Sequence, residues 1–333
     1  MPRKLLLSVW LPVIFLTGCG PSLSSLWQDY QARFIEGGRV IDTGNGNISH
    51  SEGQGYAMLL AAALKDRKAF DRLWQWTRAN LQVRPDHLFM WRRRPGIPLS
   101  EEDPNTATDG DLLIAWALLE GGMAWRDAAL TQAAWEILID LKRTVVRHWH
   151  GQVVLLPGAT GFERQEYLIL NLSYWIFPAF KRLSAHDSDS LWPQLTTSGL
   201  MLLRQARFGA FKLPPDWLEA GENLKPWRER PPRFGYEAVR IPLYLIWAGY
   251  ADPELLSPYL GYWQAFSEFI PPWIDLTNNC LGAYQASAGT HAIAALVRHK
   301  LSQSFWFKPQ PLDQDYYSAT LVLLSQLAAA SAP

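Results

Sequence analysis

Three short stretches of the sequence place acidic side chains beside glycine, aspartate or arginine, in patterns that suit acid–base chemistry. The first is SHSEGQGY at residues 49–56, between a Gly/Asn-rich turn and an Ala/Leu-rich segment predicted to be helical. Its glycines would let a ligand approach the backbone, and Glu52 would stand at the mouth of the helix as a candidate general acid. Ser49 and Glu52 also fit a capping box, which would explain the same residues without catalysis.

The second stretch is NTATDGD at residues 105–111, directly before apolar residues with helical spacing. Asp109 and Asp111 at such a helix mouth suit a sugar hydroxyl or a metal ion. Thr108 and Asp111 also form a capping signature, so a purely local role stays open. The stretch is not followed by the glycine and glutamate that would complete a calcium-binding loop.

The third stretch is FGYEAVRIP at residues 234–242. Glu237 and Arg240 are three residues apart and would share one face of a helix. One interpretation is an ordinary ion pair at the surface. The other is a carboxylate that Arg240 holds in its ionised form, which would be fit to activate a water molecule.

The segments that must position these residues are mostly helical, because their apolar residues recur every three to four positions. The predicted helices are residues 23–34, 56–65, 67–81, 109–121, 125–147, 167–183, 189–207, 236–250, 253–269, 285–300 and 313–329. About a dozen helices are too many for a four-helix bundle and fit a closed double ring in one domain. Strand signals are few, and the best is at residues 153–156. The proline-rich stretch 213–233 is long for a connection, and its aromatic residues predict a wall of a binding cleft.

The composition is that of an ordinary globular protein, with 333 residues, 48% hydrophobic residues and a formal net charge of zero. Since neither sign of charge dominates, nothing predicts a nucleic-acid partner. Tryptophan is frequent, with 17 copies. Indole rings stack on the apolar faces of sugar rings, so this count suits a carbohydrate ligand, although tryptophan also fills large cores.

The N-terminus has the pattern of a lipoprotein signal peptide. Two basic residues precede an apolar segment at residues 5–16, and LTGC at residues 16–19 ends on Cys19, the predicted site of lipidation. We therefore expect residues 1–18 to be removed and the protein to be anchored to the outer membrane, in the periplasm. A transmembrane helix is the weaker alternative, because the segment is short and a proline interrupts it. Cys280 would then lack a disulfide partner, and we expect it to be buried.

Together these stretches resemble glycoside hydrolase family 8, and most closely its periplasmic endoglucanases (cellulases) associated with cellulose synthesis. The resemblance covers nearly all of the mature chain, residues 19–333, which would form a single catalytic domain. It is carried by residues 38–42, 51–56, 107–119 with Trp125, 171–174, 215–217, 236–240 and 315–317. Three positions depart from the family pattern: Gly121 stands for alanine, Leu172 for proline and Glu237 for aspartate.

The resemblance implies an all-α (α/α)6 barrel with a substrate groove at one end of the helix ring. Glu52 would be the general acid, Glu237 the general base, and Asp109, in preference to Asp111, would contact the central sugar. In an inverting reaction the two carboxyl groups stand roughly 6.5–9.5 Å apart, which leaves room for the attacking water. The other residues expected to bind substrate are Gln54, Tyr56, Trp91, Asp111, Tyr174, Trp217, Tyr236 and Arg240.

The implied activity is inverting hydrolysis of cellulose or soluble β-1,4-glucan, accessory to bacterial cellulose synthesis, with a cellulose synthase complex as candidate partner. This chemistry needs no metal and no organic cofactor. Xylan, mixed-linkage glucan and chitosan are alternative substrates. From other classes, the alternatives are a non-catalytic glucan-binding lipoprotein of an export complex and, less well supported, a polysaccharide lyase. The histidine pairs lack the spacing of a zinc protease, and no Gly-x-Ser-x-Gly motif indicates a serine hydrolase.

Overall fold

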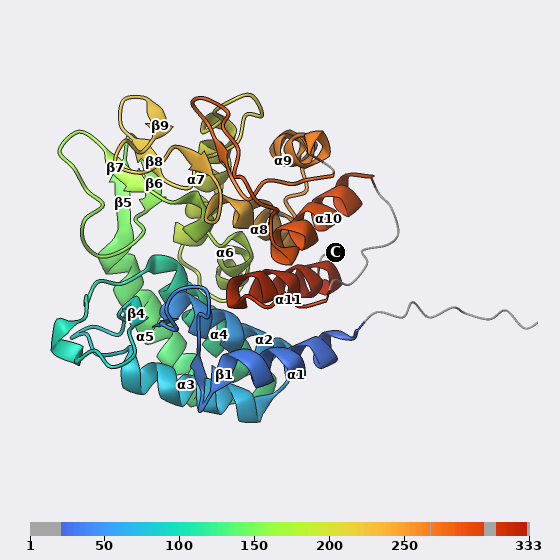
Figure 1. Cartoon of the computed structure of the whole chain (residues 1–333). Coiled ribbons are helices and arrows are strands. Elements are labelled where there is room, and N and C mark those ends of the chain that lie inside the picture. Colours follow the sequence, from blue (N-terminus) through green and yellow to red (C-terminus); the bar gives the residue numbers. More distant parts are fainter. Residues whose placement is uncertain (1–20, 267, 303–310, 332–333) are drawn as a thin grey trace, which may run out of the picture.

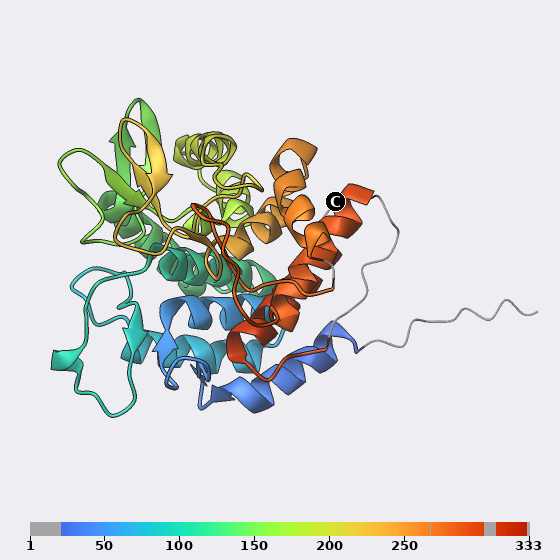
Figure 2. The same cartoon turned by 45° about the horizontal axis from the view of Figure 1, so that its top comes forward.

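The helices of the computed structural model form an inner and an outer ring, which Figures 1 and 2 show from the side. The structure describes residues 21–266, 268–302 and 311–331. Within these ranges the inner ring consists of α2 (Ser51–Ala63), α4 (Thr108–Trp125), α6 (Phe177–Ser184), α8 (Ile241–Ala248), α10 (Ala288–Ser302) and α11 (Tyr316–Ser331). Each of these helices packs on the next one named, and α11 also packs on α2, which closes the ring.

The outer ring covers the inner one and is formed by α1 (Leu23–Phe34), α3 (Arg67–Asn80), α5 (Ala128–Val145), α7 (Leu191–Gln205) and α9 (Pro253–Ala265). In Figure 1, α1 and α3 lie along the lower edge of the molecule. An outer helix needs only one apolar face, and α3 accordingly buries Phe70, Leu73, Trp74 and Thr77 and exposes the opposite side. The inner helices α2 and α4 bury nearly every side chain. The double ring predicted from the sequence is therefore confirmed.

Short antiparallel strands connect the helices and build the rims of the barrel. The pairs are β1 (Ile35–Glu36) with β2 (Arg39–Val40), β3 (Ser49–His50) with β4 (Arg92–Arg93), β5 (Val146–Trp149) with β6 (Gln152–Leu155), and β10 (Arg233–Phe234) with β11 (Ile274–Asp275). A three-stranded sheet joins β7 (Leu168–Leu170), β8 (Leu218–Ala220) and β9 (Leu224–Pro226). The strand predicted at residues 153–156 corresponds to β6.

Two predicted helices are wrong in their first parts. Residues 167–183 contain β7, the 3-10 turn η2 (Leu172–Tyr174) and only then α6. Residues 236–250 contain the 3-10 turn η3 (Ala238–Arg240) before α8. In both cases a proline, Pro178 or Pro242, stands in the first turn of the true helix, where its missing N–H costs nothing and its ring disfavours helix before it.

Two further observations concern cysteine and the membrane. Cys280 is exposed, so the expectation that it is buried is wrong. Apart from these observations, a short 3-10 turn, η1 (Leu99–Glu101), lies in the loop after β4. Within residues 21–331, as far as they are described, no helix has the length and apolar character needed to cross a membrane.

Candidate active site

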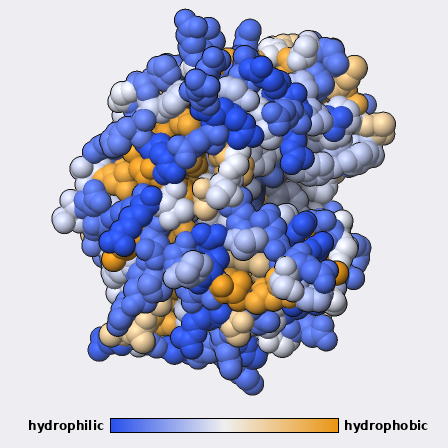
Figure 3. Space-filling model, turned by 90° about the vertical axis from the view of Figure 1, so that its left-hand side faces the viewer, coloured by the Kyte–Doolittle hydropathy of each residue, from blue (hydrophilic) through white to orange (hydrophobic). Residues whose placement is uncertain are grey.

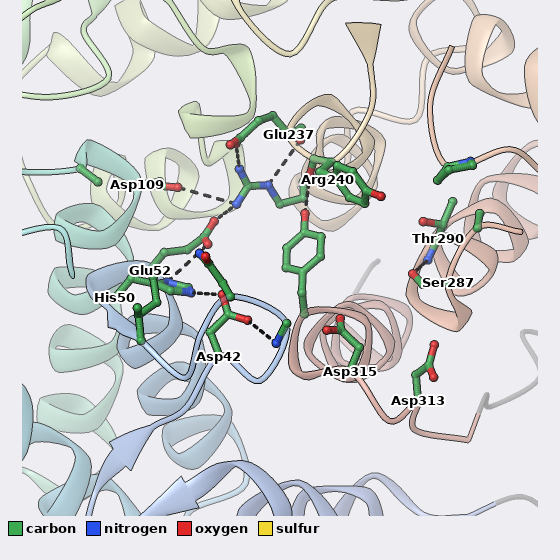
Figure 4. Close-up of a pocket in the computed structure, with 18 of the residues that line it drawn as sticks. Asp42, His50, Glu52, Asp109, Glu237, Arg240, Ser287, Thr290, Asp313 and Asp315 are labelled. Atoms are coloured by element: carbon green, nitrogen blue, oxygen red, sulfur yellow. Dashed lines mark hydrogen bonds and ion pairs between the residues drawn. The ribbon is translucent and has the colours of Figure 1, made fainter. Parts of the chain in front are cut away.

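A cavity of about 790 Å³ lies at the end of the barrel where the inner helices begin. Their first turns, or the residues just before them, bring polar side chains to it, among them Glu52, Asp109, Tyr174, Glu237 and Asp315. Figure 3 shows a hollow between the upper and lower parts of the molecule, and Figure 4 shows the side chains that line the cavity. Because backbone N–H groups at helix N-termini carry partial positive charge, this end of the barrel favours acidic groups.

Glu52 is held in the first turn of α2 by its neighbours. The N-cap is His50, whose Nδ1 accepts a hydrogen bond from the Gly53 N–H (3.0 Å), while its Nε2 lies 3.3 Å from Asp42. The capping box predicted for Ser49 and Glu52 is therefore wrong, because Ser49 donates its hydroxyl to a backbone carbonyl of β2 instead. Glu52 does not cap the helix, and its side chain lines the cavity.

One guanidinium group connects the acidic residues. Arg240 is 2% exposed, and its Nη1 forms an ion pair with Glu52 and lies 3.7 Å from Asp109. Its Nη2 forms an ion pair with Glu237 and donates to the Ser173 hydroxyl (2.9 Å). The pairing of Glu237 with Arg240 predicted from the sequence is present, but it lies in the cavity, with Arg240 buried and Glu237 half-buried. Figure 4 shows the two glutamates on either side of Arg240.

The two carboxyl oxygens of Glu52 have different surroundings. Oε1 faces Arg240 and accepts a hydrogen bond from the Tyr56 hydroxyl (3.3 Å), whereas Oε2 lies 3.7 Å from His50 Nδ1. Since donors occupy Oε1, the proton of a neutral Glu52 belongs on Oε2. Tyr56 itself does not line the cavity and acts from behind Glu52. The contact expected between Tyr56 and substrate is thus replaced by a contact with the candidate acid.

Glu237 lines the cavity, with its side chain 29% exposed. The pKa of its carboxyl is raised to about 8, chiefly by burial and also by the negative charges of the nearby Asp216 and Asp109. A hydrogen bond from the Ser173 hydroxyl (3.4 Å) lowers this pKa, and the guanidinium in contact with the carboxylate acts in the same direction. A carboxyl group with these opposing influences is suited to accept a proton near neutral pH.

Asp109 also lies in the cavity, at the first turn of α4. Burial raises its pKa to about 7. The capping role predicted for Thr108 is wrong, because Ala107 occupies the N-cap. A Cβ at Gly110 would lie 2.0 Å from the Ser51 hydroxyl. Only glycine therefore lets the N-termini of α2 and α4 approach so closely, and this approach brings Asp109 beside the candidate acid.

Two residues expected to bind substrate are internal. Asp111 is fully buried and accepts a hydrogen bond from the Thr106 hydroxyl. Gln54 is also fully buried, and it accepts from the Val40 N–H (2.6 Å) and donates to Thr77 (2.7 Å). Neither lines the cavity, so the structure corrects both expectations. Gln54 ties α2 to β2 and α3, and Asp111 ties α4 to the segment that precedes it.

The aromatic residues expected at the site divide into two groups. Trp91, Tyr174 and Tyr236 line the cavity. Trp217 does not, and it packs edge-on against Tyr174 with ring centroids 6.1 Å apart. No residue of the stretch 213–233 is among those lining the cavity, so the expectation that it forms the wall is wrong. This stretch supports the wall from behind.

The cavity also contains residues that the sequence did not single out as part of a site. They are chiefly Asp42, His50, Tyr284, Ser287, Thr290 and Asp313. Tyr284 forms a hydrogen bond between its hydroxyl and that of Tyr236 at the rim. Most of these residues lie in irregular loops, where neither periodicity nor a motif marks them. Asp42 and His50 lie inside stretches that were recognised, but only the fold brings them together.

A double ring of helices with carboxyl groups and aromatic side chains at one end suits a glycoside hydrolase, whose reaction uses two carboxyl groups flanking the scissile bond. The family model of glycosyl hydrolases family 8 matches residues 6–331. The chain belongs to this family.

Relatives and solved structures agree with this assignment. The chain is 40% identical over 303 residues to an endoglucanase of Cellulomonas uda, covering 89% of this chain and 84% of that protein. It is 39% identical over 314 residues to a probable endoglucanase of Novacetimonas hansenii, covering 93% and 91%. An endo-β-1,4-glucanase structure from Acetobacter xylinum superposes with a TM-score of 0.84 at 38% identity, covering 93% and 98% of the two chains.

Proposed function

We propose that the protein is an endo-β-1,4-glucanase that hydrolyses its substrate with inversion, with Glu52 as general acid and Glu237 as general base. The observation that carries the proposal is the placement of these two carboxylates in one cavity, on different nitrogens of one buried guanidinium. The similarity to endoglucanases over most of the chain supports the substrate class.

In the proposed reaction, Glu52 Oε2 gives its proton to the leaving glycosidic oxygen. Glu237 removes a proton from a water molecule, which attacks the anomeric carbon from the opposite face. The guanidinium between the two carboxylates keeps them from direct contact, and inversion requires a separation of roughly 6.5–9.5 Å for the water between base and sugar. Asp109, beside Arg240 Nη1 at 3.7 Å, is placed to accept a hydrogen bond from a sugar hydroxyl.

The proposal is tested by following a cello-oligosaccharide with proton NMR during hydrolysis. The first product observed should be the α-anomer, and the viscosity of a soluble cellulose derivative should fall faster than reducing ends accumulate. Initial appearance of the β-anomer would contradict inversion. Binding without release of reducing ends would favour a glucan-binding lipoprotein, and an unsaturated product absorbing ultraviolet light would favour a lyase. The same assays on xylan, mixed-linkage glucan and chitosan rank the substrates.

We also propose that the mature protein begins at a lipidated Cys19, that it is anchored to the outer membrane facing the periplasm, and that it assists cellulose synthesis. The sequence pattern of residues 1–19 supports the anchor; this segment precedes the described residues. The motif resemblance supports the link to a cellulose synthase complex. Replacing Cys19 with serine should move the protein from the membrane fraction to the soluble fraction, together with a loss of cellulose yield. An unchanged membrane fraction contradicts the lipid anchor.

A further inference from the structure

The loop that carries Glu237 is held by an acidic side chain from a distant part of the chain. Asp216, in the loop before β8, accepts hydrogen bonds at Oδ1 from the N–H groups of Gly235 (3.0 Å), Glu237 (3.1 Å) and Ala238 (2.8 Å). Its own N–H donates to the carbonyl of Arg233 (2.6 Å). These N–H groups stand at or before the start of η3 and have no acceptor within a helix. Asp216, 21 residues before Glu237 in the sequence, accepts from them and so caps the turn.

The local sequence permits this contact. A Cβ at Gly235 would lie 2.9 Å from Asp216 Oδ2, which is closer than a side chain tolerates. Glycine at this position therefore allows the carboxylate to approach the backbone of the turn. Asp216 is not a substitute for the base itself, because it does not line the cavity and one of its oxygens is occupied by three donors.

Asp216 also places a second acidic group beside Glu237. Burial raises the pKa of Asp216 to about 6, against the three backbone donors and Arg233, which lower it. The negative charge of Asp216 is in turn one of the causes that raise the pKa of Glu237. The other charged or titratable groups that face Glu237 are Asp109, Arg240, Tyr174, Tyr244 and Tyr317, and the uncharged donors are Asn171 and Ser173.

We propose that Asp216 is a positioning residue for the general base, and that it acts in two ways. Its carboxylate fixes the backbone of Glu237, and its negative charge makes the Glu237 carboxylate a stronger proton acceptor. The proposal rests on the proposed function, because it assumes that Glu237 is the base. The contact with Asp216 explains how the Glu237 carboxylate, on a side chain one methylene longer than that of aspartate, keeps a defined position. The backbone from which the side chain extends is fixed.

Two substitutions separate the two actions. Asp216→Asn keeps an oxygen for the three backbone donors and removes the charge, whereas Asp216→Ala removes both. For Asp216→Asn we expect the acid limb of the kcat/KM profile to move to lower pH by on the order of one unit, because a like charge near Glu237 has been removed. For Asp216→Ala we expect kcat to fall by roughly a hundredfold, with KM changed by much less, because misplacement of about 1 Å has this effect.

The matched control is Glu219→Gln, three residues further along the same segment. Glu219 is buried and paired with Arg228 and Lys225 and does not line the cavity, so its substitution should leave the pH profile in place. An Asp216→Asn protein that is folded by circular dichroism and has the wild-type profile overturns the electrostatic action. An Asp216→Ala protein with wild-type kcat overturns the positioning action. If Glu237→Gln is fully active, the proposed function fails instead, whatever the Asp216 variants do.

Discussion

Replacing Glu52 with glutamine is expected to lower kcat on cello-oligosaccharides by on the order of a thousandfold while binding is retained. The amide has nearly the size of the carboxyl, and its oxygen can still accept hydrogen bonds from Tyr56 and Arg240. It carries no proton that can be given to the leaving oxygen, and a positioned general acid contributes about 10²–10⁴-fold. Reducing-sugar release measures the loss, and isothermal titration with a cello-oligosaccharide measures the binding.

The leaving group provides a control for this result. A cellobioside with a dinitrophenolate leaving group needs little protonation, so Glu52→Gln should retain most of its activity on that substrate. A loss of equal size on both substrates would mean that the substitution has damaged the site in another way. Full activity on unactivated cello-oligosaccharides would remove Glu52 from the acid role and leave Asp109 as the nearest alternative, at 3.7 Å from the same Arg240 nitrogen.

The architecture was predictable because the helices carry their signals locally. The outer helix α3 repeats its buried residues every three to four positions, and α1 was predicted with the same bounds that the structure has. The starts of α6 and α8 were not predicted, because the apolar residues before them continue the pattern while the backbone forms η2 and η3 instead. Apolar spacing alone does not distinguish a helix from a 3-10 turn that buries the same side chains.

The site was predictable only in its short segments. Glu52, Asp109 and Glu237 each stand in a recognisable stretch, and all three line the cavity. The contacts that define their environments join distant parts of the chain. Arg240 reaches Glu52 across 188 positions and Asp216 reaches the base turn across 21, and no local pattern encodes such a pair. The capping signatures gave wrong predictions for the same reason, because the Ser49 hydroxyl donates to a carbonyl of β2 and not to a group of its own helix.

The convergence of helix N-termini connects the fold with the chemistry. The cavity is lined from the starts of inner helices, so the positive ends of helix dipoles gather where acidic groups are needed. Burial opposes ionisation of the same groups and raises the pKa of Asp109 to about 7 and of Glu237 to about 8. A site of this kind keeps carboxyl groups near the point of titration at neutral pH, which is where general acids and bases work best.

The Glu237 side chain is expected to show a graded response to substitution. Glu237→Gln should lower kcat by on the order of a thousandfold, because the amide does not accept a proton from water. Glu237→Asp should lower kcat by roughly ten- to a hundredfold: Asp216 holds the backbone in place, so the shorter side chain draws the carboxylate back by about 1 Å.

Because Glu237 must be ionised to act and its pKa is raised to about 8, activity should fall as the pH drops through that value.

Azide separates loss of the base from loss of the site. Glu237→Ala leaves room on the face of the sugar from which water attacks, and azide needs no base to act as a nucleophile. With an activated cellobioside, azide should restore turnover in Glu237→Ala and yield the α-glycosyl azide, while it should have no effect on the wild type. A β-glycosyl azide would indicate a nucleophilic carboxylate and a retaining reaction. Glu237→Gln with wild-type kcat would assign the base to another carboxylate, and the acid limb of its pH profile would then identify that group by its position.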